Sequence, residues 1–257
     1  MKTIKIIFIN LSVLGVTALV FSSCKKVLGL SLQENYNYQQ RTLDPHINMT
    51  AKEFIIARAD GNTGSPTDTV FRWMKKGLDY CGFDMTEFEK TDRTYIFLHN
   101  DAIRIYNTTT KAVTGGLFYT FPIVNVDASG NPVIDATTGL PKTHPALDWS
   151  EYSKETVKNY FMYLIGKGTF NFNDLNADNK TVVSILPPGT KAGKESMLGY
   201  YNNGVGFDQE SKFYLRIQNN ADIAPIVHND RANDRSGGYV ANNGVVHVFA
   251  QVVYPAK

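Results

Sequence analysis

The sequence lacks the residue spacings that usually mark catalytic or metal-binding sites. Its five histidines are scattered, and no pair of them has the spacing of a zinc site. It contains neither a Gly-X-Ser-X-Gly turn nor a glycine-rich phosphate-binding loop. We therefore assign no catalytic residue, no metal and no cofactor, and we expect a protein that is not an enzyme.

Net charge is also small. The chain has 26 Lys and Arg against 24 Asp and Glu, and the first 23 residues contribute Lys2 and Lys5 but no acid. Removal of that segment leaves 24 positive and 24 negative side chains. A protein with no net charge and no basic cluster has no positive electrostatic potential to attract the phosphates of nucleic acid, so we exclude nucleic-acid partners.

The only long apolar run lies at the start of the chain. Ile6 to Val20 follows the two lysines and is too short to span a membrane comfortably, as expected for the apolar region of a secretory signal. Phe21-Ser22-Ser23-Cys24 then resembles the lipobox of bacterial lipoproteins, with Phe21 a loose match at its first position. We predict a signal peptide over 1–23 and lipidation of Cys24; the alternative is an ordinary signal peptide cut near Ser23.

Cysteine is scarce, with Cys24 and Cys81 the only two. If Cys24 carries lipid, Cys81 has no partner, and the exported chain folds on its hydrophobic core alone. Cys81 falls on the apolar face of an expected helix, so we interpret it as a small buried hydrophobic residue. The polar stretch 24–45 is predicted to be a flexible tether to the membrane.

Periodicity predicts helices and strands beyond the tether. Apolar residues at helical spacing, with capping residues at the ends, predict helices Ala51–Arg58 after Thr50, Val70–Cys81 after Asp68 or Thr69, and Lys154–Ile165 after Ser153. Strands are expected at Thr94–Leu98, Thr181–Leu186, Lys212–Gln218 and Ile223–Val227. The sequence therefore predicts both helices and strands.

The end of the chain is the strongest strand signal. Asn243-Gly244 is expected to form a tight turn with positive φ, and Val245 to Val253 is apolar on both faces, as in a central strand. His247, inside this run, is expected to be a neutral core histidine bonded to backbone.

The same stretch carries a resemblance to a known family. Asn243-Gly244-Val245-Val246-His247-Val248, followed by Val252-Val253-Tyr254-Pro255, resembles the closing motif of fasciclin domains. Thr94–Ile103 resembles their first motif, although Leu98, His99 and Ile103 replace its Pro, Thr/Ser and last Phe. Lys158–Gly168 lies where the family has a helix ending in Tyr-His, and here the His is absent.

The resemblance covers roughly 46–257 and implies a fold and a function. The implied fold is α+β, a wedge-like β-sandwich of about seven strands with the three helices packed against it. The implied function is adhesion or binding, displayed on the outer membrane of a Gram-negative bacterium by Cys24; which face of that membrane carries it stays open. The Asp-Ile pair tied to integrin recognition in animal fasciclin domains is Gly238-Tyr239 here, so that ligand mode is not expected.

Two segments interrupt the family pattern and hold the candidate ligand-binding aromatics. Residues 107–147 are expected to form an inserted β-ribbon whose Phe118 and Tyr119, with Trp149 nearby, either stack on sugar or cover an open sheet edge. Residues 187–208 are expected to form a long loop holding Tyr200, Tyr201 and Phe207. The partner is thus an extracellular protein or, for an accessory lipoprotein of polysaccharide uptake, a glycan.

Overall fold

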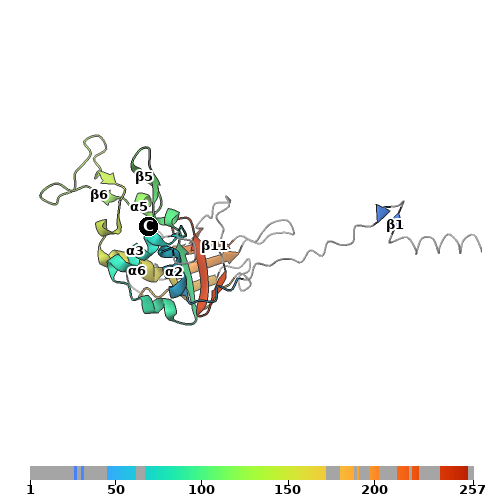
Figure 1. Ribbon diagram of the computed structural model, residues 1–257. Helices are drawn as coiled ribbons and strands as arrows, with labels where there is room; N and C mark the ends of the chain where they lie inside the picture. Colours follow the sequence, from blue (N-terminus) through green and yellow to red (C-terminus); the bar gives the residue numbers. More distant parts are fainter. Residues whose placement is uncertain are drawn as a thin grey trace, which may run out of the picture. The chain divides into compact units, whose positions relative to one another are not determined.

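The computed structural model describes residues 26–27, 30–31, 45–61, 67–171, 180–187, 190, 197–202, 213–219, 222–225 and 238–253 (Figure 1). The chain divides into two units, Met1–Asp44 and Pro45–Lys257. In the first, β1 (Lys26–Val27) and β2 (Leu30–Ser31) form a short antiparallel ladder. The predicted signal peptide and Cys24 lie outside the described residues.

The second unit contains both helices and strands. Its helices are α2 (Ala51–Ala59), α3 (Arg72–Cys81), η1 (Met85–Glu89), α4 (Asn100–Ile103), α5 (Leu117–Thr120), η2 (Trp149–Glu151) and α6 (Lys154–Tyr163). Its strands are β3 (Arg93–Leu98), β4 (Ile105–Asn107), β5 (Ala112–Gly115), β6 (Ile123–Val124), β7 (Thr143–His144), β8 (Ile165–Lys167), β9 (Lys180–Val183), β10 (Met197–Asn202), β11 (Phe213–Asn219), β12 (Asp222–Pro225), β13 (Tyr239–Ala241) and β14 (Gly244–Phe249). The predicted α+β class is confirmed.

Two four-stranded sheets form most of the β-structure of this unit, beside the two-stranded sheets β4-β5 and β6-β7. One has the order β13-β14-β3-β8 and the other β12-β11-β10-β9. They meet where Gly166 and Ser184 form an antiparallel bridge, and the Ile185 amide donates to the Ile165 carbonyl at 2.8 Å. In the first sheet β14 runs parallel to β3, with Val246 opposite Tyr95, so the last described strand lies beside one from the middle of the chain.

The predicted central strand is β14. It pairs with β13 on one side and β3 on the other, and residues of both its faces are buried. It ends at Phe249, earlier than expected, because the chain then turns onto α6, where the Tyr160 hydroxyl donates to the Val253 carbonyl at 2.6 Å. Pro255 lies outside the described residues.

The expected positive-φ turn at Asn243-Gly244 is wrong. The two-residue turn is Asn242-Asn243, and Gly244 has ordinary backbone angles. Glycine is required there for space, because a Cβ on Gly244 would lie 2.4 Å from the Arg93 carbonyl oxygen. The turn therefore brings β14 against the start of β3.

Local capping explains where the helices begin and end. The Thr50 side chain accepts from the Glu53 amide and Glu53 reaches back to the Thr50 amide, a capping box that starts α2. Ser153 caps α6 and Gly82, at φ 62°, ends α3, both as predicted. The predicted cap of α3 at Asp68 or Thr69 is wrong.

α3 is capped by a residue far away in sequence. The Asn100 side chain accepts from the Trp73 amide at 3.0 Å and donates to the Thr69 carbonyl at 2.7 Å. Asp68 instead forms an ion pair with Arg58 at 3.0 Å. A tertiary contact thus supplies what the local sequence does not.

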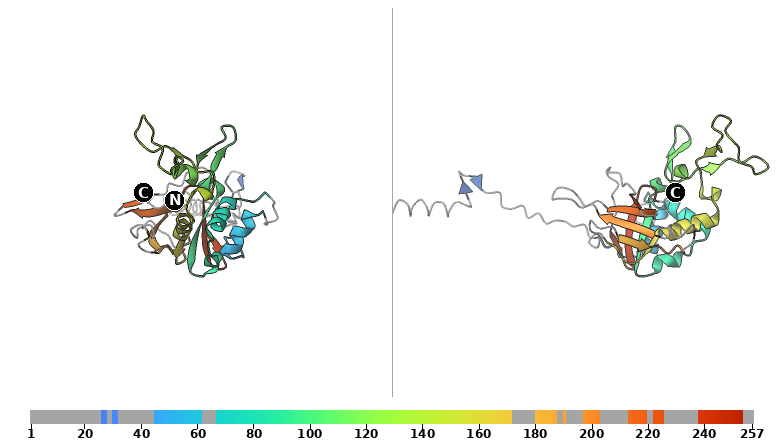
Figure 2. Two further views of the ribbon diagram at one scale, coloured as in Figure 1. Left: turned by 90° about the vertical axis from the view of Figure 1, so that its left-hand side faces the viewer. Right: turned by 180° about the vertical axis from the view of Figure 1, so that it is seen from behind.

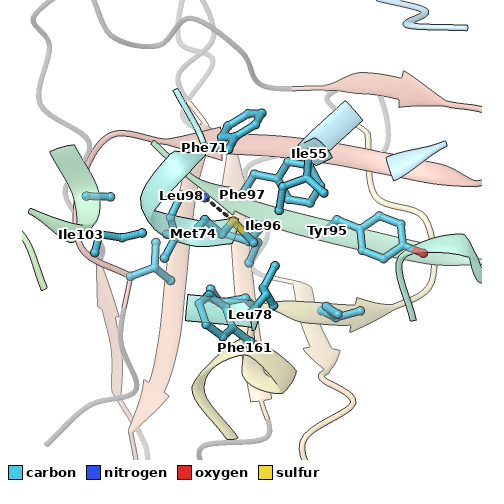
Figure 3. Packing of buried hydrophobic residues seen from close by; sticks show 14 of the residues in the cluster. Ile55, Phe71, Met74, Leu78, Tyr95, Ile96, Phe97, Leu98, Ile103 and Phe161 are labelled. Carbon is cyan, nitrogen blue, oxygen red and sulfur yellow. Dashed lines mark hydrogen bonds between the residues drawn. The ribbon is translucent and has the colours of Figure 1, made fainter. Parts of the chain in front are cut away.

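The core lies between the helices and the β13-β14-β3-β8 sheet, and Figure 3 shows its centre. Met74 and Leu78 of α3 point toward β3, where the Met74 sulfur accepts from the Leu98 amide at 3.2 Å. Gly77 permits close helix packing, since a Cβ there would lie 2.6 Å from the Trp149 ring. Cys81 is buried at the end of α3, as expected.

The segment predicted as one ribbon over 107–147 differs from that prediction. It contains two hairpins, β4–β5 and β6–β7, separated by the short helix α5. The ribbon prediction is wrong at Leu117–Thr120, because the helical geometry of α5 places both Leu117 and Phe118 in the core and leaves Tyr119 outside.

The expected loop over 187–208 is also interrupted. β10 occupies Met197–Asn202 and pairs with β9 on one side and β11 on the other. Two neighbouring strands give its backbone groups partners, which explains why a stretch rich in turn-forming residues is extended here.

Candidate binding surface

The structure separates the aromatic residues that the sequence grouped as ligand candidates. Phe118 is 0% and Trp149 is 1% exposed, and their rings meet edge to face at 5.1 Å. Trp149 also donates its indole N–H to the Trp73 carbonyl at 2.8 Å. Both are core residues, which corrects the expectation that they stack on sugar; Tyr119, 54% exposed, is the one that faces solvent.

Of the remaining candidates, the structure describes the strand positions of Tyr200 and Tyr201 only. Tyr200 and Tyr201 lie on β10, opposite Leu215 and Tyr214 of β11. Phe207 and Cys24 lie outside the described residues. The proposed grouping of these loop aromatics with the ribbon aromatics thus stays a prediction.

The segment from 105 to 147 holds most of the exposed large hydrophobic side chains in 45–61, 67–171, 182–187 and 238–253. Eight of the nine in those ranges belong to it: Ile105, Tyr106, Tyr119, Val124, Val126, Ile134, Leu140 and Leu147. The ninth is Val183. Both hairpins project from the same side of the second unit in Figures 1 and 2. We call residues 105–147 the hairpin surface.

Side chains at the turns give the second hairpin a defined shape. The Asp127 carboxylate accepts from the Asn131 and Ser129 amides at 2.9 and 2.8 Å, and Asp135 accepts in the same way from Thr137 and Thr138. These hydrogen bonds hold the pKa of both carboxyl groups below the ordinary value. The turns are therefore built to display neighbouring apolar side chains such as Val126 and Ile134.

The base of this hairpin is tied to η2. His144 of β7 contacts the Asn125 side-chain oxygen through Nδ1 and the Glu151 carboxylate through Nε2, the latter at 3.0 Å. Glu151 also accepts from the Leu147 amide at 2.6 Å. Partial burial opposes ionisation of Glu151, but these hydrogen bonds dominate and lower its pKa.

A cation–aromatic cluster, missed from the sequence, lies at the base of the first hairpin. The Arg104 guanidinium lies 4.8 Å from the centre of the Trp73 ring and 4.6 Å from that of Tyr106. The Lys76 ammonium lies 4.9 Å from the same Trp73 ring and pairs with Asp148. Each such contact is worth about 0.5–2 kcal/mol. Trp73 itself packs at the rim of the core.

Arg104 differs from the cations around it. Its Nε is buried, and within the described residues it has neither a hydrogen-bond acceptor nor a carboxylate within 4.0 Å. A buried donor without an acceptor costs about 1–3 kcal/mol. Only the positions of Trp73 and Arg104 in the fold, 31 residues apart in sequence, bring the cluster together, so no local pattern announces it.

Two polar residues of the closing motif, His247 and Asn243, are buried and hydrogen-bonded to other parts of the protein. His247 is 0% exposed; its Nδ1 accepts from the Gly238 amide at 2.9 Å and its Nε2 donates to the Phe170 carbonyl at 2.8 Å. Burial lowers the pKa of His247 to about 4, so the ring is neutral, as predicted. Asn243 likewise bonds only inside the protein.

The described residues hold neither a metal-binding group nor a membrane-spanning helix. Among the described residues, no group of three or more His, Cys, Asp or Glu side chains is placed to hold a metal ion. In the same part of the chain, no helix is long and apolar enough to cross a membrane. No model of a known protein family matches the chain, and no curated protein matches it in sequence. The fasciclin resemblance is thus carried by its short motifs.

Proposed function

We propose that this chain is a non-catalytic binding module of the bacterial cell envelope. It is fastened to the outer membrane through lipidated Cys24 and contacts an extracellular protein through the hairpin surface. The carrying observation is that eight of the nine exposed large hydrophobic residues in 45–61, 67–171, 182–187 and 238–253 belong to that surface. Apolar side chains gathered outside a core are typical of an interaction site.

The fold we propose with it is the fasciclin-like sandwich of about seven strands. Support comes from the pairing of β3 with β14, which carry the first and the closing motif. Residues of the closing motif also have structural roles in this arrangement. Gly244 allows the close approach to Arg93, and His247 and Asn243 bond to neighbouring segments.

A protein partner agrees better with the exposed side chains than a glycan does. Sugars are bound largely through flat aromatic faces, and of the candidates in or near the ribbon Phe118 and Trp149 are buried. Val124, Val126, Ile134, Leu140 and Leu147 are aliphatic and suit the apolar centre of a protein interface. The alternative remains a glycan-binding accessory lipoprotein of a polysaccharide-uptake system, which would use Tyr200, Tyr201 and Phe207.

The test is to probe paired arrays of extracellular-matrix proteins and of polysaccharides with the purified full chain. The hairpin variant Val126→Asp with Leu140→Asp alters two exposed side chains. Its control adds the same two charges outside the hairpin surface, at Val183→Asp with Asn242→Asp. We expect retention on a matrix protein, weakened about tenfold or more in the hairpin variant and unchanged in the control.

Three outcomes contradict the proposal. One is equal retention of the hairpin variant and its control. Another is retention on polysaccharides alone, lost on Tyr200→Ala with Tyr201→Ala, which supports the alternative. The third is no retention on either array.

A further inference from the structure

Arg104 is a cation available for a ligand. Within the described residues Lys52, Arg58, Lys75, Lys76, Lys90 and Lys142 each have a carboxylate partner. Arg104 has none in the same part of the chain, like Arg72, Arg93, Lys111, Lys154, Lys158 and Lys167, and its Nε is also buried without an acceptor, as is that of Arg93. The rings of Trp73 and Tyr106 hold its flat guanidinium. A guanidinium held in this way is pre-organised to bind a carboxylate through two parallel hydrogen bonds.

A free strand edge begins at the next residue. β4 (Ile105–Asn107) pairs only with β5 in its two-stranded sheet, and its residues form no other backbone hydrogen bonds to the described chain. An unpaired edge accepts an added strand from another polypeptide through main-chain hydrogen bonds. Ile105 and Tyr106, both exposed, offer apolar contacts along that edge.

We propose that an extended acidic segment of a partner protein adds to the edge of β4 and places a carboxylate on Arg104. This rests on the proposed function and names its ligand chemistry. The cation alone would accept an acidic sugar equally well. The open edge of β4 favours a peptide, because only a polypeptide backbone matches the alternating donors and acceptors of a strand.

Trp73 reports on the site. The chain has two tryptophans; Trp149 is buried, whereas Trp73 is partly exposed and contacts Arg104. The probe is poly-L-glutamate, which charge repulsion keeps extended at neutral pH. We expect saturable change in the tryptophan emission of the full chain, lost in Trp73→Phe, and slowed amide exchange at 105–107.

Variants distinguish specific binding at Arg104 from non-specific attraction between poly-L-glutamate and positive charges. Arg104→Gln should weaken the response about tenfold or more, the size of one charge-assisted contact. Arg104→Lys keeps the charge but not the planar fork and should also weaken it. Lys111→Gln removes an exposed charge from the same hairpin and should change the midpoint less than twofold. Unchanged melting temperatures show that each variant is folded.

Four results overturn the inference. They are a flat titration, equal weakening by Lys111→Gln and Arg104→Gln, exchange at 105–107 that poly-L-glutamate does not slow, and a stronger response to polygalacturonate than to poly-L-glutamate at equal carboxylate concentration, which assigns the site to acidic sugar. The hairpin variant Val126→Asp with Leu140→Asp should titrate normally. Failure of the array test with a normal titration therefore contradicts the proposed function and leaves the Arg104 site standing.

Discussion

Replacing Asn243 with alanine should destabilise the whole second unit, because this side chain joins three segments. Its Oδ1 accepts from the Ala51 amide at the start of α2 at 2.9 Å. Its Nδ2 donates to the Phe88 and Lys90 carbonyls at 2.9 and 3.1 Å and lies 3.2 Å from the Tyr95 hydroxyl. Only 7% of Asn243 is exposed, so water does not readily replace it.

The magnitude follows from the groups left without partners. The Ala51 amide and the Phe88 carbonyl lose this contact, whereas the Lys90 carbonyl keeps the Tyr95 hydroxyl at 2.6 Å. Each buried unsatisfied group costs about 1–3 kcal/mol, so we expect a loss of about 3 kcal/mol in the free energy of unfolding. For a unit of this size that lowers the melting temperature by about 6–12 °C.

Urea denaturation followed by circular dichroism measures the loss, with Asn242→Ala as the matched control. Asn242 is the exposed neighbour in the same turn and should change stability by less than about 0.5 kcal/mol. A loss below about 1 kcal/mol in Asn243→Ala, or an equal loss in the control, would refute the reasoning.

The isosteric variant Asn243→Asp adds a pH test. Burial against the Phe88 and Lys90 carbonyls disfavours the ionised carboxylate, so the folded-state pKa rises above the unfolded value. The stability of the variant relative to wild type should then be greatest below about pH 4, the unfolded pKa of Asp, and should fall as pH rises above it. A pH-independent difference from wild type contradicts this.

Three further predictions concern other residues of the account. Gly244→Ala should cost about 1–3 kcal/mol, since the new Cβ meets the Arg93 carbonyl at 2.4 Å; an unchanged urea midpoint would show that β14 lies further from β3. Because His247 has a pKa of about 4 when folded and about 6.5 when unfolded, its contribution to stability is present above pH 6.5 and falls by about 3 kcal/mol toward pH 4. His247→Gln should flatten that part of the pH profile, and parallel profiles for the two proteins would contradict it. In cells treated with globomycin, a larger precursor of the wild-type chain should accumulate, and an unchanged size excludes lipidation. The variant Cys24→Ala should not incorporate labelled palmitate.

The sequence predicted elements whose signals are local. Thr50, Ser153 and Gly82 act on the backbone within a few residues, and the helices they bound lie where periodicity placed them. The buried, two-sided character of β14 was also readable, because a central strand requires a continuous apolar run.

Long-range contacts account for what was missed. The cap on α3 comes from Asn100, which lies 27 residues beyond the Trp73 amide that it caps. The ribbon prediction included 117–120, but burial of both Leu117 and Phe118 favours the helix α5 there.

The candidate surface shows the same division. The sequence marked the inserted segment as the place to look, and the exposed apolar residues are there. It could not distinguish Tyr119 from its neighbour Phe118, because that choice depends on what α5 packs against. Nor did it reveal that Arg104 meets Trp73, since that contact joins different elements of the fold.

Adhesion of living cells measures whether the hairpin surface binds an extracellular protein when the chain is displayed on the outer membrane. Gram-negative cells producing the full chain would be layered on the matrix protein selected by the array and counted after washing. We expect wild-type cells to attach, and cells producing Val126→Asp with Leu140→Asp at the same surface level to attach no better than cells without the protein. Attachment of those variant cells at the wild-type level would contradict it.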